Sequence, residues 1–267
     1  MTDYITKLLQ DTLVVDTETT SLDFREAEVI QYASDSALKV LETIALEEFE
    51  VSNDFYKPAK PISAKISSIT TITNRMVADS IDFKTTLDDV QEEFNKYKYM
   101  VAHNAYYDDR IFKEHDLITP ENLCTLRLSR KLLVDDPSIE EHTLSYLRYA
   151  LDLPIPDDIP AHLADADVMV TALLLAHLIG LALEQGVIND DSDYGEQLIE
   201  YLASPVVMTI MPFGKHKGKK LTEVPISYWQ WAMDKMDSLN EADPAYDKDF
   251  AASVSAAVEA ILEKNAS

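Results

Sequence analysis

Three acidic segments, far apart in the sequence, carry the side chains best suited to chemistry. Asp16 and Glu18 stand two residues apart in DTET, directly after an apolar run, while Asp108 lies in HNAYYD and Asp167 in HLADAD. Residues i and i+2 of a strand point to the same face, so the first two carboxylates can share one site. If the fold brings the other two beside them, the chain contains a dense group of four carboxylates.

Such a group requires positive charge. Two carboxylates about 4 Å apart repel each other by about 4 kcal/mol at an effective dielectric constant near 20. Divalent cations that prefer oxygen ligands, Mg²⁺ or Mn²⁺, would remove that repulsion. A pair of such ions can activate a water molecule and stabilise the leaving oxygen of a phosphodiester. The pattern therefore predicts two divalent metal ions and a phosphodiester hydrolase.

Other titratable residues lie close to these acids in the sequence. His162 precedes Asp167 by five residues, and a neutral imidazole there can accept a proton from the attacking water. Asp165 is expected to cap the helix that follows, and Asp109 is expected to be a surface acid. The predicted catalytic set is therefore the four carboxylates with His162 as general base.

The elements that must position these residues alternate between strands and helices. Helices are expected over residues 87–97, 126–133, 143–151 and 165–184, the last being apolar nearly all round and therefore a core helix. Strands are expected over Thr12–Val15, Glu28–Tyr32, Leu41–Val51 and Tyr99–Ala102. This order predicts an α/β sandwich with a mixed sheet.

Taken in order, DTET, HNAYYD and HLADAD resemble the three exonuclease motifs of the histidine-bearing (DEDDh) branch of the DEDD 3′–5′ exonuclease superfamily. The resemblance covers roughly residues 10–180 and includes the segment ITTITNRMVAD. It implies a ribonuclease H-like exonuclease fold, with a mixed central sheet flanked by helices. It also implies hydrolysis of terminal phosphodiesters, with release of nucleoside monophosphates from a 3′ end.

The resemblance also assigns roles to individual residues. The metal-binding carboxylates fall on Asp16, Glu18, Asp108 and Asp167, and the general base falls on His162. Ser21 stands where the family commonly has glycine, so the tightness of this turn depends on backbone angles that serine avoids. The implied substrate-binding residues are Thr19, Thr20, Leu22, His103, Asn104 and Tyr107.

A basic segment, PFGKHKGKK, stands apart from this acidic chain. Such lysines beside aromatic residues can bind phosphates and stack bases. The alternative is a solvated lysine turn on a small module whose tryptophans form its core, and core packing is the role expected for Trp229 and Trp231. The segment resembles the small C-terminal module of exonuclease X-type enzymes, which favours DNA as substrate. The residues predicted to contact the DNA are Lys215, Lys217, Lys219 and Lys220.

The domain organisation follows from these segments. An exonuclease domain is expected over residues 1–186, an acidic linker over 187–204, and a small α-rich, basic and aromatic module over 205–267 that ends in a helix.

The composition of the chain limits which binding modes, metal sites and cellular locations are expected. The 267 residues include 23 Lys plus Arg against 48 Asp plus Glu, a net charge of −25 that disfavours broad adhesion to nucleic acid but permits a local site. The single cysteine, Cys124, excludes an intrachain disulfide and a cysteine-based zinc site. No signal peptide is evident, and the apolar run Val168–Leu183 is shorter than the ~20 residues of a membrane span.

We therefore expect a soluble, cytoplasmic enzyme without a membrane partner, and a virus-encoded enzyme acting in a host cytoplasm remains open. The predicted activity is a metal-dependent 3′–5′ exodeoxyribonuclease that acts on DNA with a free 3′ end. One alternative is a 3′–5′ exoribonuclease acting on RNA, because only discrimination of the 2′-hydroxyl separates the two. Another is a catalytically retired module that binds nucleic acid or protein, against which the complete set of four acids and His162 counts. The sequence identifies no protein partner.

Overall fold

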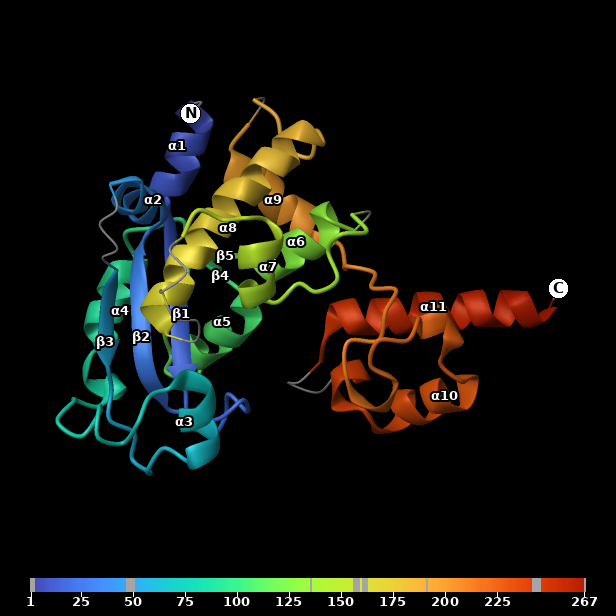
Figure 1. Ribbon diagram of the computed structural model, residues 1–267, viewed down its shortest axis with the longest axis horizontal. Helices are drawn as coiled ribbons and strands as arrows, with labels where there is room; N and C mark the ends of the chain where they lie inside the picture. Colours follow the sequence, from blue (N-terminus) through green and yellow to red (C-terminus); the bar gives the residue numbers. More distant parts are fainter. Residues whose placement is uncertain are drawn as a thin grey trace. The chain divides into compact units, whose positions relative to one another are not determined.

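The computed structural model describes residues 3–46, 51–134, 136–155, 159, 163–190, 192–241 and 246–266. The chain divides into two compact units, Met1–Leu202 and Ala203–Ser267 (Figure 1). Each unit has a hydrophobic core of its own, so each is described separately.

A five-stranded mixed sheet forms the centre of the first unit, in the order β3-β2-β1-β4-β5. Strand β1 pairs antiparallel with β2 and parallel with β4, which places it in the middle of the sheet. This arrangement confirms the predicted α/β fold with a mixed sheet. The strands are β1 (Thr12–Thr19), β2 (Val29–Ser36), β3 (Ser52–Phe55), β4 (Tyr99–Ala102) and β5 (Glu121–Cys124).

Helices cover both faces of this sheet, because successive strand residues point to opposite sides. Val14 and Val101 belong to one core cluster, whereas their neighbours Leu13 and Met100 belong to another. Cys124 is a free cysteine, buried in the second cluster. The helices of this unit are α1 (Asp3–Gln10), α2 (Ala37–Ala45), α3 (Ala64–Thr70), α4 (Leu87–Phe94), α5 (Ala105–Lys113), α6 (Thr125–Leu132), α7 (Leu144–Ala150), α8 (Ala164–Glu184) and α9 (Tyr194–Ala203).

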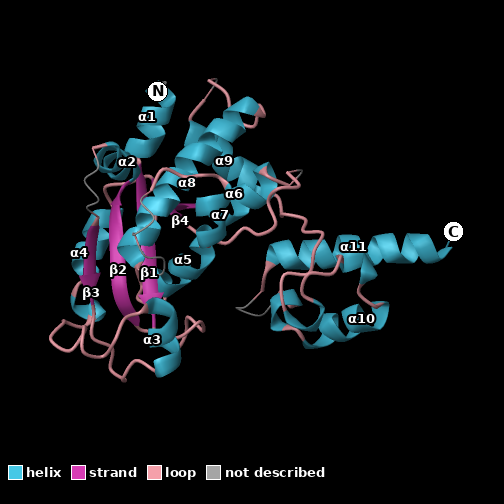
Figure 2. Cartoon of the chain, in the orientation of Figure 1, coloured by secondary structure: helices cyan, strands magenta, loops and turns pink. Residues whose placement is uncertain are grey.

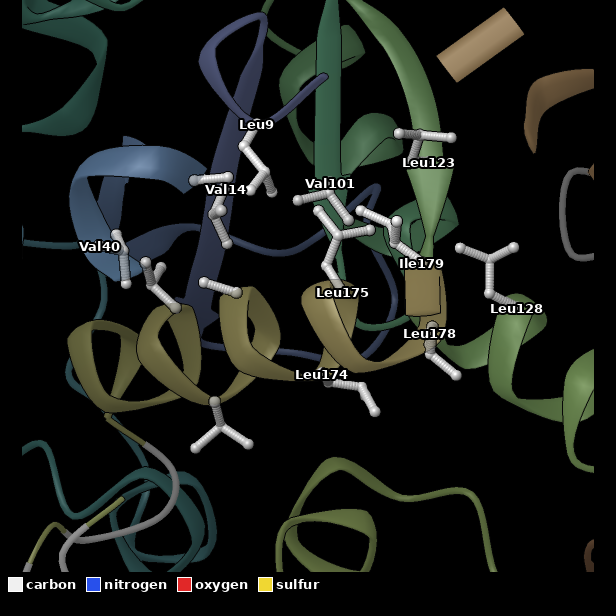
Figure 3. Close-up of a cluster of buried hydrophobic side chains, with 14 of the residues drawn as sticks. Leu9, Val14, Val40, Val101, Leu123, Leu128, Leu174, Leu175, Leu178 and Ile179 are labelled. Carbon is white, nitrogen blue, oxygen red and sulfur yellow. The ribbon is translucent and has the colours of Figure 1, made fainter. Parts of the chain in front are cut away.

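Helix α8 is the core helix that the apolar run predicts. It contacts β1 and β2 on one side and α2, α6 and α7 on the others. Figure 3 shows Leu175 and Ile179 of α8 among Val101, Leu123 and Leu128, which come from the sheet and from α6. Its 21 residues are long and apolar enough to cross a membrane by length and composition, but most of them are buried in this core. Burial on all sides explains its composition.

The predicted strand over Leu41–Val51 is wrong. Residues 37–45 form α2, whose buried residues Ala37, Val40 and Ile44 recur at spacings of three and four. That spacing is the period of a helix with one covered face, and the helix packs against α8. The neighbouring strand, β3, begins only at Ser52.

The predicted acidic linker over residues 187–204 is also wrong, because α9 occupies its second half. Tyr194, Leu198 and Leu202 are buried in the same cluster as α8. Gly195 permits close packing, since a Cβ added there would lie 2.3 Å from ring atoms of Tyr99. The acidic residues around α9 therefore belong to a packed helix of the first unit rather than to a connector.

The second unit consists of helices and loops (Figure 2). Trp229 is fully buried in its core, as predicted, whereas Trp231 is 52% exposed, so the core-packing role expected for it is wrong. The helix expected at the end of this module is present as α11. The helical elements are η2 (Gly214–His216), η3 (Leu221–Glu223), α10 (Ile226–Lys235), η4 (Asp237–Leu239) and α11 (Lys248–Ala266).

Candidate active site

Strand β1 carries two of the predicted carboxylates at its carboxyl end. Val14, Asp16 and Glu18 alternate along one face of the strand, and Val14 packs in the cluster that includes α8. Asp167, in the first turn of α8, lies over the same face. Carboxylate oxygens of Asp16, Glu18 and Asp167 all lie within 4.8 Å of one another. The sheet and the core helix thus bring together acids that are 150 residues apart in the sequence.

Asp108 approaches from the other side of β1. It lies in the first turn of α5 and is buried, with 4% of its surface exposed. Its Oδ1 accepts hydrogen bonds from the Thr17 backbone N–H at 3.1 Å and from the Thr17 Oγ1 hydroxyl at 2.7 Å. Thr17 stands between Asp16 and Glu18, so these bonds hold Asp108 beside both.

The electrostatics of this group are those of uncompensated negative charge. Burial first, and then the charges of Asp167 and Asp108, raise the pKa of Asp16 well above its usual range. The same causes raise the pKa of Glu18 to about 8. Burial raises the pKa of Asp108 to about 7, against the lowering effect of its bonds from Thr17. Closely spaced, desolvated carboxylate oxygens fit a divalent cation such as Mg²⁺ or Mn²⁺.

Gln31 on β2 is a residue of this site that sequence reasoning missed. It is buried, pairs with Glu18 across the strands, and accepts a hydrogen bond on Oε1 from the Ala164 backbone N–H at 3.1 Å. That bond fixes the first turn of α8, and therefore Asp167, over β1. A polar side chain inside an otherwise buried strand was the available signal.

Two acids next to the site differ from their predicted roles. Asp165 does not cap α8, since the capping position is Leu163 and the buried Oδ1 of Asp165 has no hydrogen-bond partner among the described residues. Asp109 is buried rather than exposed, because Lys113 Nζ and Thr119 Oγ1 donate to its carboxylate at 2.7 and 2.6 Å. Asp109 therefore anchors α5.

The predicted general base, His162, lies outside the described residues, so its role remains a prediction. The structure describes α8 from Ala164 onward, with Leu163 immediately before it.

The turn after β1 requires no glycine. The Ser21 carbonyl accepts hydrogen bonds from Thr19 Oγ1 at 2.8 Å and from the Tyr107 hydroxyl at 2.6 Å. Ser21 is not among the described non-glycine residues with positive φ, and its own Oγ accepts a bond from the Asp23 backbone N–H at 3.1 Å. Serine therefore suits this turn, and Thr19 with Tyr107 fixes its shape.

The remaining predicted substrate contacts lie around this turn and at the start of α5. Thr20 uses its backbone N–H and its Oγ1 to pair with the backbone of Glu28, and Leu22 is 83% exposed. Asn104 is exposed before α5, in the left-handed conformation with φ 78°.

His103 is held inside the protein by both ring nitrogens. Nε2 must donate to the His142 carbonyl at 2.9 Å, which assigns Nδ1 as the acceptor for Thr125 Oγ1 at 3.0 Å. Burial lowers the pKa of His103 to about 4, so the ring is neutral. This ring orders the β4–α5 turn, and neither nitrogen is left for the predicted substrate contact.

The four predicted lysines lie on one turn of the second unit. Lys215, Lys217, Lys219 and Lys220 are all exposed, and none forms an ion pair with a described acidic residue. Their charge therefore faces solvent.

The amino-acid sequence matches family models and known proteins. The model of the RNase T-type family, described as "Exonuclease", matches residues 13–175, and a model described as "Putative quorum-sensing-regulated virulence factor" matches residues 200–236. Exodeoxyribonuclease 10 of Escherichia coli strain K12 is 28% identical over 231 residues, which cover 85% of this chain and 92% of that protein. DNA polymerase III PolC-type of Streptococcus pyogenes is 31% identical over 169 residues, covering 61% of this chain and 11% of that protein.

Solved structures show the same fold. Exonuclease X in complex with 5′ overhanging duplex DNA aligns with a TM-score of 0.50 and 25% identity, covering 72% of this chain and 99% of that one. Escherichia coli exonuclease I in complex with a dT13 oligonucleotide aligns with a TM-score of 0.52 and 18% identity, covering 74% and 47%. With its ribonuclease H-like sheet and its clustered carboxylates, the chain is a nuclease that belongs to the exonuclease family, within the DEDDh superfamily.

Proposed function

We propose that this protein is a 3′–5′ exodeoxyribonuclease that removes nucleoside 5′-monophosphates from the free 3′ end of DNA in the cytoplasm. The observation that carries the proposal is the convergence of Asp16, Glu18 and Asp167, with Asp108 held beside them. The DNA preference is supported by the similarity to exodeoxyribonuclease 10 over most of both chains.

The four carboxylates would hold two divalent metal ions, Mg²⁺ or Mn²⁺. Their oxygens are the hard ligands that these ions prefer, and their raised pKa values express a repulsion that cations would relieve. When bound, such ions supply electrostatic stabilisation to a phosphodiester that is being hydrolysed.

The chain's own residues would position the 3′-terminal nucleotide. The turn after β1, fixed by Thr19 and Tyr107, presents the exposed side chain of Leu22, an apolar surface against which a base or sugar can lie. Asn104 offers an exposed amide at the start of α5. His162 would accept the proton of the attacking water as general base.

The test is degradation of 5′-labelled DNA and RNA single strands of one sequence, with Mn²⁺ or with EDTA. We expect a metal-dependent ladder that shortens the DNA from its 3′ end, and slower loss of the RNA. Asp16→Asn should lower the rate by about a thousandfold or more, since catalysis by bound metal amounts to several kcal/mol.

The matched control is Asp116→Asn, which removes an exposed carboxylate just after α5 at a left-handed position that asparagine tolerates. This control should keep the wild-type rate. Faster loss of RNA would reassign the substrate to RNA, and undiminished hydrolysis by Asp16→Asn would refute the site.

A further inference from the structure

Helix α10 carries two tryptophans, one in the core of the unit and one exposed to solvent. Trp229 is fully buried and packs toward Phe250, whereas Trp231 is 52% exposed. Tyr228 lies three residues before Trp231 on the same side of the helix, and their ring centroids are 5.4 Å apart at an interplanar angle of 43°. Tyr228 is half-buried and packs against the core of the unit, whereas the Trp231 ring beside it lies largely in solvent.

This aromatic surface adjoins the lysine turn. The Tyr228 ring meets the His216 ring edge to face, with centroids 4.6 Å apart. His216 is the buried residue of the turn. Its neighbours in the sequence, Lys215 and Lys217, are both exposed. A Cβ added at Gly214 would lie 4.0 Å from the Tyr228 hydroxyl, so the turn's backbone also borders that ring.

The lysine turn and the aromatic pair thus lie next to each other through His216 and Gly214. Together they are called the aromatic–lysine surface, made up of Lys215, Lys217, Lys219, Lys220, Tyr228 and Trp231. Its four lysines form no ion pair with any described acidic residue, in a chain whose net charge is −25. Exposed lysines on a turn that adjoins an aromatic pair with one exposed ring suit a ligand that alternates phosphates with flat bases. An acidic peptide would use the lysines but would leave the rings without a partner.

We propose that Tyr228 and Trp231 form a stacking platform for the bases of a single strand, while the lysine turn binds its phosphates. The inference rests on the proposed function only in taking the bound strand to be the polymer that the enzyme degrades. It assigns Trp231 a contact with a base, a role beyond the phosphate contacts expected of the lysines.

The test uses the chain's own fluorescence, because its two tryptophans differ so strongly in exposure. The full-length Asp16→Asn protein is titrated with an oligothymidylate of about 20 nucleotides and with an abasic strand of equal length. We expect the oligothymidylate to quench the emission of Trp231. Trp231→Ala should weaken oligothymidylate binding by about 5- to 150-fold, the range of one stacked base, with affinity measured for both strands from the anisotropy of a 5′-fluorescein label.

The abasic strand separates stacking from charge, since it has phosphates but no bases. The abasic strand should bind the parent protein and the Trp231→Ala variant with the same affinity. Met233→Ala is the matched control, because Met233 is 51% exposed on the same helix but lies on another side of it. This variant should bind both strands as the parent protein does.

The proposal is overturned if neither strand quenches Trp231, which would assign its exposed ring to another partner. It is also overturned if Trp231→Ala weakens binding of both strands equally. Hydrolysis by the wild-type protein is scored separately. Quenching without hydrolysis would refute the proposed function alone, and hydrolysis without quenching would refute the stacking platform alone.

Discussion

At the scale of single residues, the carboxylates of the site make the metal-free protein sensitive to pH. The pKa of Glu18 is raised from its ordinary 4.5 to about 8, so the folded protein binds a proton between these values that the unfolded chain releases. The free energy of unfolding therefore falls as pH rises through this window. We expect the melting temperature in EDTA to drop between pH 6 and pH 9.

Two changes should remove this dependence. Mg²⁺ in hundredfold excess over its Kd should add about 2.7 kcal/mol to the free energy of unfolding, most visibly at high pH. Asp16→Asn should stabilise the metal-free protein at pH 8 by about 1–3 kcal/mol, because one repelling charge is gone. Calorimetry across pH with EDTA or Mg²⁺ measures both effects. A melting temperature that rises with pH in EDTA would contradict the repulsion described here.

At the scale of elements, the site depends on how the first turn of α8 is attached to β2. Gln31→Met keeps the side-chain volume but leaves the buried N–H of Ala164 without its acceptor. We expect a loss of about 1–3 kcal/mol in the free energy of unfolding. Because Asp167 stands on that turn, Mg²⁺ affinity, measured by calorimetric titration, should fall as well.

The control for this prediction is Gln91→Met on α4. The Gln91 amide also accepts a backbone hydrogen bond, from the Ile118 N–H at 2.8 Å, but it is not part of the carboxylate site. That variant should lose stability and keep its Mg²⁺ affinity. If both variants bind Mg²⁺ equally well, Gln31 serves the fold alone and does not position Asp167.

At the scale of the whole molecule, a chain of net charge −25 must approach a polyanion. The four exposed lysines of the turn in the C-terminal unit, which form no ion pair with a described acidic residue, are the local exception. Replacing Lys215, Lys217, Lys219 and Lys220 by glutamine should weaken single-strand binding and reduce the slope of log affinity against log salt by up to about 3. Binding titrations from low to high salt measure this slope.

A charge control uses lysines that already contact a carboxylate. Replacing Lys7, Lys39 and Lys96, which pair with Asp11, Asp35 and Glu92, should change the salt slope far less per lysine removed. An equal change per lysine in both variants would show that overall charge governs binding, and that the turn contacts no phosphate.

Much of the site was predictable because its signals are local. The alternation of Asp16 and Glu18 along a strand, the position of Asp108 after β4 and the apolar α8 behind Asp167 can each be read within a few residues. The same local patterns predicted an α/β fold with a mixed sheet, which the structure confirms, but they did not predict the order of its strands.

Other features depend on contacts that no local pattern encodes. The apolar residues of α2 recur at the helical spacing of three and four, but their burial depends on α8, which packs against this helix and lies far away in the sequence. The acidic composition before α9 suggested a connector. The sequence around α9 could not reveal its packing, because Tyr99 and the core cluster that hold this helix come from elsewhere in the chain. The exposure of Trp231 follows from Trp229 already filling the core.

The sequence by itself determined the types and order of the candidate metal-binding acids, the α/β class and the basic C-terminal segment, since each depends on neighbouring residues. Only the tertiary structure decided that Gln31 holds α8, that both nitrogens of His103 bond within the protein, and that Tyr228 adjoins the lysine turn. The physical reason is that burial and hydrogen bonding are set by residues distant in sequence, which only folding brings into contact.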